Sequence, residues 1–289
     1  MARAGRQLNL SGVYAAAVTP NRPGTQDIDY SSLMDQLDFL AAAKVTGISL
    51  LDSAGEFLNF PFVDRQRAVY LGSKRSRVPM MVGVSHSTLS GAIHLAGEAI
   101  SAGADGLLLM PPCFFRYEQP EIEEFFRVFA RETGDAVPIL LHNIPECTSP
   151  IEIATAKRLL DSGRFAGVKD SSGDWNYFED LRDFRRDRPF ALFTGNDCVA
   201  LRALREGADG VISDCAAAIP ELVVARDERM NEFVARASRF PAPIAIKRAV
   251  QIRKQKAGDS AVPFNAERAG ELDQFSQWFA AWWPTVRQE

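Results

Sequence analysis

The segment Phe165-Ala166-Gly167-Val168-Lys169-Asp170-Ser171-Ser172-Gly173 has the pattern of one buried strand followed by one sharp turn. Small and apolar residues over 165–169 favour a strand, and the Asp, Ser and Gly residues after them are typical of a turn that caps a helix. A helical pattern follows over 175–184. The segment therefore predicts one β/α unit of a parallel sheet.

The same unit recurs on both sides of this segment. Short apolar runs alternate with amphipathic helical patterns, and they predict strands over 14–18, 47–51, 79–84, 106–110, 138–141, 165–169, 190–194 and 210–213. The similar phrases AGADG at 102–106 and EGADG at 206–210 support this pattern, because their glycines stand where a helix ends and a strand begins. Eight such alternations predict a closed parallel (β/α)8 TIM barrel.

The chain after the eighth strand reads as helical and ends in an aromatic cluster of Trp278, Phe279, Trp282 and Trp283. We expect this cluster to pack onto the barrel or onto another subunit. The predicted organisation is a barrel over residues 1–225 and a C-terminal helical extension over 226–289. No linker separates the two, so they are expected to form a single domain.

Composition and charge exclude several classes of protein. The 289 residues are 46% hydrophobic and 24% charged, which is ordinary globular composition, and the net charge of −4 argues against a nucleic-acid surface. The four cysteines form no C-x-x-C pair and fit a reducing compartment. Residues 1–11 lack the apolar stretch of a secretory signal, and no apolar run is long enough to span a bilayer. We therefore expect a cytoplasmic protein with no nucleic-acid or membrane partner.

Two residues at predicted strand ends carry the candidate chemistry, because barrel enzymes place their active sites at the C-terminal ends of the strands. Desolvation of Lys169 would favour its neutral amine, the nucleophile that forms a Schiff base with a carbonyl compound. The alternative is that Lys169 simply reaches solvent. His142 has a side-chain pKa close to that of a proton shuttle at neutral pH, although a lone histidine after a strand can also be structural.

The turn Ser53-Ala54-Gly55 is the candidate site for the carboxylate of a 2-oxo acid. Its consecutive backbone N–H groups and the Ser53 hydroxyl are donors that do not titrate, although Gly55 can also serve only the turn. With Ser53 as a third catalytic candidate beside Lys169 and His142, the candidate substrate-binding residues are Thr19, Asp52, Ala54, Gly55, Gly195, Asn196, Ile212 and Ser213.

Metal and nucleotide cofactors are not expected. The three histidines, at positions 86, 94 and 142, form no H-E-x-x-H motif, and no clustered carboxylate set accompanies them. We interpret His86 as structural. No G-x-G-x-x-G or Walker pattern is present. The expected partner is therefore a small 2-oxo acid, with no cofactor.

Over about residues 12–264 the chain resembles the dihydrodipicolinate synthase and N-acetylneuraminate lyase family of pyruvate-dependent class I aldolases. The resemblance rests on ordered motifs: Val18-Thr19-Pro20, Gly55-Glu56, Pro111-Pro112, Asn143-Ile144-Pro145, Gly167 to Gly173, Gly195-Asn196-Asp197 and Gly210-Val211-Ile212-Ser213. It implies that Lys169 is the Schiff-base lysine, that Ser53 and Ala54 lie at the pyruvate carboxylate, and that the protein assembles as a homotetramer or homodimer.

The sequence departs from this family pattern near the candidate site. His142 replaces the tyrosine of the family's Y-N-x-P motif, and Cys147 replaces the arginine two residues after it. In the family's G-[ST]-T-G-E turn, Asp52 replaces the first glycine and Ala54 the second hydroxyl residue. The paired-tyrosine segment reads Cys113-Phe114-Phe115. A carboxylate at Asp52 would repel acidic substrates or bind the hydroxyls of a sugar-derived one.

The predicted function is a lyase or aldolase in which Lys169 forms a Schiff base with pyruvate or another 2-oxo acid. Its expected substrate is a deoxy sugar acid or 4-hydroxy-2-oxo acid, and a dehydratase that works through the same imine is a close variant. One alternative is dihydrodipicolinate synthase itself, which the absence of tyrosine at position 142 and arginine at 147 disfavours. Another is a catalytically silent paralogue that binds a ligand without turnover.

Overall fold

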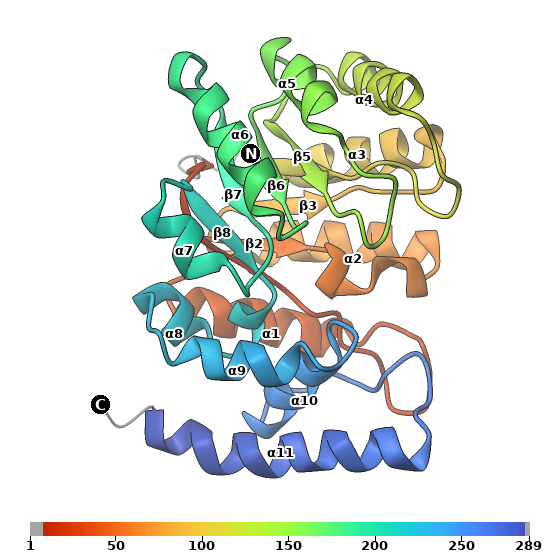
Figure 1. Ribbon diagram of the computed structural model, residues 1–289. Helices are drawn as coiled ribbons and strands as arrows, with labels where there is room; N and C mark the ends of the chain where they lie inside the picture. The colour runs from red at the N-terminus through yellow and green to blue at the C-terminus, as the bar shows by residue number, and fades with distance from the viewer. Residues whose placement is uncertain (1–7, 287–289) are drawn as a thin grey trace.

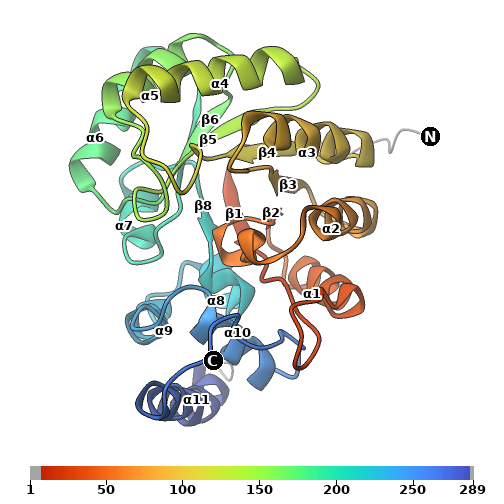
Figure 2. The same ribbon diagram turned by 90° about the vertical axis from the view of Figure 1, so that its right-hand side faces the viewer.

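A closed barrel of eight parallel strands forms the centre of the computed structural model, which describes residues 8–286. Each strand pairs with the next in sequence, and β8 pairs with β1, so the predicted TIM barrel is confirmed (Figures 1 and 2). The strands are β1 (Gly12–Ala16), β2 (Gly47–Leu50), β3 (Met80–Gly83), β4 (Gly106–Leu109), β5 (Ile139–Asn143), β6 (Gly167–Asp170), β7 (Ala191–Thr194) and β8 (Gly210–Ser213).

A helix follows each strand and packs on the outside of the barrel (Figure 2). These helices are α1 (Tyr30–Ala42), α2 (Phe62–Arg75), α3 (Leu89–Ala102), α4 (Gln119–Thr133), α5 (Ile153–Asp161), α6 (Trp175–Phe184), α7 (Ala200–Arg205) and α8 (Pro220–Ala225). Their apolar faces and the outward side chains of the strands form one continuous core cluster. This burial is the main term that stabilises the barrel.

Polar side chains determine where several helices begin. Thr88 accepts a hydrogen bond from the Gly91 N–H at the start of α3, and Asp174 accepts from the Asn176 and Tyr177 N–H groups at the start of α6. The cap of α6 therefore lies just beyond the Asp-Ser-Ser-Gly turn that the sequence analysis expected to supply it. Asp170 instead accepts a hydrogen bond from Asn143 of β5, which ties two neighbouring strand ends together.

A second, smaller cluster fills the barrel interior. Tyr14 and Phe193 meet edge to face there, with ring centroids 5.7 Å apart, and Ile212 is buried beside them. Their bulk requires a small residue on β8, since a Cβ at Gly210 would lie 2.5 Å from the Phe193 ring. The interior is therefore packed, and the space for chemistry lies above it, at the carboxyl ends of the strands.

Three further helices follow the barrel: α9 (Met230–Ala237), α10 (Ile244–Ile252) and α11 (Ala266–Val286). Helix α10 lies between α11 and the barrel (Figures 1 and 2). The aromatic cluster of α11 is partly buried within this layer: Phe279 is fully enclosed, and the Arg253 guanidinium lies 4.3 Å from the Trp283 ring centroid. The expected division at residue 225 into barrel and extension of a single domain stays a prediction, and its outer limits, 1–7 and 287–289, lie outside the described residues.

None of the helices in the described part of the chain combines the length and the apolar character needed to cross a bilayer.

Candidate active site

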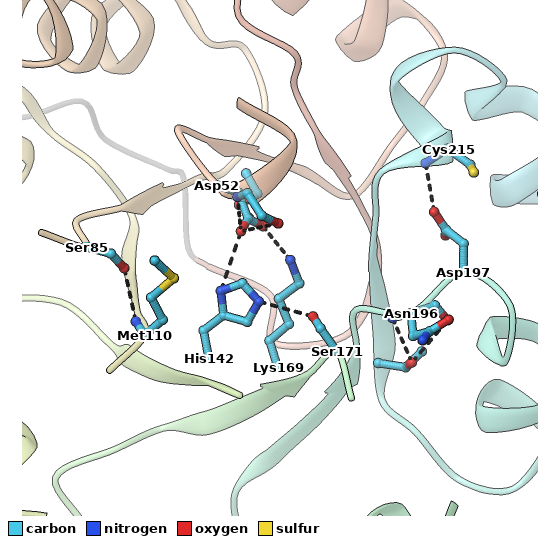
Figure 3. A network of polar contacts seen from close by, with 12 residues as sticks. Asp52, Ser85, Met110, His142, Lys169, Ser171, Asn196, Asp197 and Cys215 are labelled. Atoms are coloured by element: carbon cyan, nitrogen blue, oxygen red, sulfur yellow. Dashed lines mark hydrogen bonds and ion pairs between the residues drawn. The ribbon is translucent and has the colours of Figure 1, made fainter. Parts of the chain in front are cut away.

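Lys169 lies at the carboxyl end of β6 and is fully buried, so the alternative that it reaches solvent is wrong. Its Nζ donates a hydrogen bond of 2.6 Å to Oδ2 of Asp52, which lies two residues beyond the end of β2 and is only 2% exposed (Figure 3). Two opposite charges buried together stabilise each other, because neither has water as an alternative partner. The lysine and the carboxylate therefore form one unit at the mouth of the barrel.

The Asp52 carboxylate has three further partners. Oδ2 accepts from the Ser49 hydroxyl at 3.2 Å, Oδ1 accepts from the Ser53 backbone N–H at 2.7 Å, and Nδ1 of His142 lies 3.5 Å from Oδ1. Burial opposes the charged form, but the charge of Lys169 and the hydrogen bonds from Lys169 and Ser53 hold the pKa of Asp52 well below its usual range. Asp52 is therefore ionised at neutral pH.

His142 stands beside this pair on β5, and its Nε2 lies 3.1 Å from the hydroxyl of Ser171 (Figure 3). Burial and the neighbouring Lys169 charge lower the pKa of His142 to about 3, although Asp52 acts in the opposite direction. The expected pKa near neutrality is therefore wrong, because the sequence does not reveal that the imidazole is enclosed beside a cation. His142 is a neutral imidazole at pH 7.

The Ser53-Ala54-Gly55 turn is a single 3₁₀ turn, η1 (Ser53–Gly55), and two of its three N–H groups are already used. The Ser53 N–H donates to the Asp52 side chain, and the Gly55 N–H donates to the Asp52 carbonyl at 2.8 Å. Within the described residues, only the buried Ala54 N–H of this turn has no acceptor. The expected row of free donors for a substrate carboxylate is therefore not present.

The remaining predicted residues divide into two groups. Gly195 lies against the lysine: a Cβ there would be 2.3 Å from Lys169 Cε. The Thr19 hydroxyl instead donates to the Gly55 carbonyl and so ties the loop after β1 to η1, and the Ser213 hydroxyl accepts from the Ala216 N–H within the loop after β8. Asn196 likewise accepts from the Cys198 N–H. Ile212 belongs to the packed barrel interior.

Sequence reasoning missed three polar residues at this edge: Ser49, Ser171 and Asp214. Ser49 is the one hydroxyl in the apolar run Gly47–Leu50, and Asp214 directly follows β8, so both positions carried a signal. Oδ1 of Asp214 is enclosed and has no hydrogen-bond partner among the described residues. Burial raises the pKa of Asp214 to about 7, with a smaller upward effect of Asp197 and Asp52 and an opposing effect of Lys169.

A cavity of about 390 Å³ lies between Ser53 and the C-terminal region. One wall comes from the loop after β2 and the other from the segments on either side of α10. Its lining is mostly apolar and includes Phe57, Met110, Cys147, Ile244, Val262 and Phe264. The described residues include no group of three or more His, Cys, Asp or Glu side chains that could hold a metal ion.

Comparison with known proteins identifies the family. The profile of the dihydrodipicolinate synthetase family matches residues 9–232. The chain belongs to the dihydrodipicolinate synthetase family. Among relatives of this family, an uncharacterized DapA-like lyase of Chloroflexus aurantiacus is 33% identical over 219 residues, which are 73% of this chain and 72% of that protein.

Two further matches are proteins named as synthases. A 4-hydroxy-tetrahydrodipicolinate synthase of Methanothrix thermoacetophila is 29% identical over 77% of this chain and 74% of its own. The solved structure of the 4-hydroxy-tetrahydrodipicolinate synthase of Methylacidiphilum fumariolicum SolV superimposes with a TM-score of 0.84 at 22% identity and covers 97% of this chain and 99% of its own. That likeness supports the barrel fold, and family membership makes the chain a lyase.

Proposed function

We propose that this lyase works through a Schiff base between Lys169 and a small carbonyl compound. The observation that carries the proposal is the hydrogen-bonded pair of Lys169 and Asp52, buried at the carboxyl end of the barrel. A nucleophilic amine must first give up the ammonium proton, and a carboxylate at 2.6 Å is placed to take it. Family membership supports the same chemistry.

The proposed reaction begins when the free amine of Lys169 attacks the carbonyl carbon. A carbon–nitrogen bond forms and the carbonyl oxygen leaves as water, so the ammonium and the carbonyl compound become an iminium ion and one water molecule. The iminium withdraws electrons from the neighbouring carbon. A carbon–carbon bond to a hydroxyl-bearing carbon then breaks as the hydroxyl loses its proton, which leaves an enamine on Lys169 and a free carbonyl compound. In the dehydratase variant the neighbouring carbon loses a proton instead, and the hydroxyl on the next carbon takes up a proton and leaves as water.

A line of polar groups supplies a path for the protons. Ser171, His142, Asp52 and Lys169 follow one another at distances of 3.1, 3.5 and 2.6 Å (Figure 3). Because the low pKa of His142 disfavours a charged ring, we propose that the imidazole passes protons on without holding them: Nε2 accepts a proton from the Ser171 side as Nδ1 gives one to Asp52. We propose that this line serves in place of the family tyrosine that the sequence lacks.

The identity of the carbonyl compound depends on Asp52. The sequence predicts pyruvate or another 2-oxo acid, with cleavage or condensation of a deoxy sugar acid or 4-hydroxy-2-oxo acid, and membership of the family that resembles pyruvate-dependent aldolases supports an oxo acid. A carbonyl compound without a neighbouring carboxylate is equally compatible with imine chemistry. Cytoplasmic location and assembly as a homotetramer or homodimer stay predictions.

Two alternatives make different predictions. If the chain is itself a 4-hydroxy-tetrahydrodipicolinate synthase, as several relatives are named, it will rescue a lysine auxotroph that lacks this enzyme. His142 and Cys147 stand where such enzymes have tyrosine and arginine, so we expect no rescue. If the chain is a silent paralogue, it will bind a carbonyl compound without any covalent adduct.

Borohydride trapping tests the imine. Incubation with a panel of 2-oxo acids, aldehydes and ketones, followed by reduction and peptide mass spectrometry, should give an adduct on Lys169. Lys169→Ala should abolish it, whereas the control Lys157→Ala, which removes a half-exposed lysine paired with Asp180, should leave it unchanged. The absence of any adduct on Lys169 across the whole panel would overturn the proposal.

A further inference from the structure

The Asp52 carboxylate occupies the place that the sequence analysis assigned to a substrate carboxylate. It accepts the hydrogen bond of the Ser53 N–H, which was the first expected donor for a 2-oxo acid, and it lies directly against the lysine that would form the imine. Both of its oxygens are engaged, and the side chain is shielded from solvent. The Ser53 hydroxyl also donates to Asp52 Oδ1, at 3.4 Å, so within the described residues the Ala54 N–H is the one expected donor of this turn that has no acceptor.

The backbone around Asp52 restricts movement of its carboxylate away from Lys169. Leu51 has a positive φ of 55°, and its carbonyl lies so close to β3 that a Cβ at Gly83 would approach it to 2.2 Å. The Asp52 side chain also caps η1 through Ser53. Moving the carboxylate away would cost that cap and would leave the buried Lys169 without its counter-ion.

The balance of charge also disfavours a second carboxylate beside Asp52. Within the described part of the chain, two basic side chains act on Asp52, namely Lys169 and His142. His142 is neutral at pH 7, so Lys169 is the cation of the two. The buried pair is therefore balanced at one positive and one negative charge. A 2-oxo acid would add a second buried anion with no cation to match it, whereas an uncharged carbonyl compound would keep the balance.

We infer that Asp52 takes the place of the substrate carboxylate, so that the compound bound by Lys169 is an uncharged aldehyde or ketone. This inference rests on the proposed imine chemistry and changes the substrate class within it. The ammonium of Lys169 and the carbonyl compound give an iminium and water, and Asp52, once it has passed on the proton that it takes from the ammonium, is the counter-ion of the iminium. The aldol substrate is then a β-hydroxy aldehyde or ketone, and the mostly apolar cavity beside Ser53 is where its second half would lie.

Hydroxyacetone and pyruvate are matched probes for this inference, because they differ in a hydroxymethyl group against a carboxylate. Each is incubated with the protein at the same concentration and reduced with borohydride, and the labelled fraction of the Lys169 peptide is measured. The Lys157 peptide of the same sample corrects for the intrinsic reactivity of the two carbonyls. In the wild type we expect hydroxyacetone to label Lys169 about tenfold more than pyruvate, which corresponds to a difference of about 1.4 kcal/mol in favour of the uncharged compound.

Two variants separate charge from space. Asp52→Asn removes the charge and keeps the shape of the side chain. Asp52→Gly restores the residue of the family turn and removes the side chain, so that the space of the carboxylate becomes free. Both should lower the preference for hydroxyacetone, and Asp52→Gly should reverse it. Circular dichroism establishes whether each variant is folded, and the wild-type ratio decides the inference even if neither variant folds.

The outcomes are distinct. Labelling of Lys169 by pyruvate as strongly as by hydroxyacetone in the wild type would overturn this inference and leave the imine proposal standing. An unchanged ratio in folded Asp52→Gly would likewise overturn it. Labelling by neither probe, nor by any other carbonyl compound of the panel, would overturn the imine proposal itself, and the inference with it.

Discussion

At the scale of single residues, Asp52 gives this site its character. A glycine in its place would leave Lys169 as a lone buried cation with an open row of donors beside it. With aspartate, the lysine is paired, the Ser53 N–H is occupied and His142 lies next to a negative charge. One substitution therefore changes both the protonation of the site and the charge of the compound that can enter it.

The pKa of His142 predicts a pH dependence of stability. Its folded value of about 3 lies below the unfolded value of 6.5, so between these limits the unfolded chain binds a proton that the folded chain does not. The contribution of the neutral His142 to the free energy of unfolding is present above pH 6.5 and is lost as the pH falls toward 3. In urea unfolding, the free energy of unfolding should fall between pH 7 and pH 5. This fall should be smaller by about 2 kcal/mol in His142→Gln than in the wild type.

The exposed His94 supplies the control for this measurement. His94→Gln removes an imidazole on the surface of α3, so it should retain the wild-type loss between pH 7 and pH 5. An equal pH dependence in the wild type and in His142→Gln would contradict the prediction.

At the scale of secondary-structure elements, the loop after β7 positions the lysine. The Gly195 backbone lies against the Lys169 stem and the Ser171 hydroxyl. A Cβ added at Gly195 would lie 2.3 Å from Lys169 Cε and 2.2 Å from Ser171 Oγ. Gly195→Ala should therefore displace the lysine and lower its borohydride labelling about tenfold or more, with a loss of stability of about 1–3 kcal/mol from overpacking.

Gly97→Ala is the matched control, because Gly97 is exposed within α3 and an added Cβ would meet no atom within 4 Å. This variant should keep full labelling and gain about 0.5–1 kcal/mol in stability, since alanine loses less conformational entropy in a helix. Full labelling of Gly195→Ala would show that the loop does not hold the lysine.

At the scale of the whole molecule, a second buried ion pair joins the C-terminal helices to the barrel. Nζ of Lys247, on α10, donates to the Glu56 carboxylate at 2.7 Å, directly after the turn that carries Asp52. Both side chains are at least 90% buried, so removing one partner leaves an uncompensated charge. The pair links the helical layer to the same loop that shapes the site.

Lys247→Met should therefore lower the free energy of unfolding by about 3 kcal/mol, and Lys247→Met combined with Glu56→Gln should restore part of the loss. Unfolding by tryptophan fluorescence, which draws on three tryptophans of α11 and on Trp175 of α6, should coincide with unfolding by circular dichroism. Two separate transitions in the wild type would contradict the prediction of a single domain.

Local patterns determined the fold and the location of the site. Alternating apolar runs and helical periods specify eight β/α units, and the end of a parallel strand places Lys169 at the mouth of the barrel, because strand direction follows from chain order. The same reasoning gave the candidate residues of the neighbouring strand ends.

Only the tertiary structure decided what those residues do to one another. Lys169 and Asp52 are separated by 117 residues in the chain and by 2.6 Å in space, so no local pattern predicts their pairing. The neutral state of His142 follows from burial and from the nearby Lys169. Hydrogen bonding, desolvation and charge pairing depend on which groups exclude water together, and that property exists only once the barrel has closed.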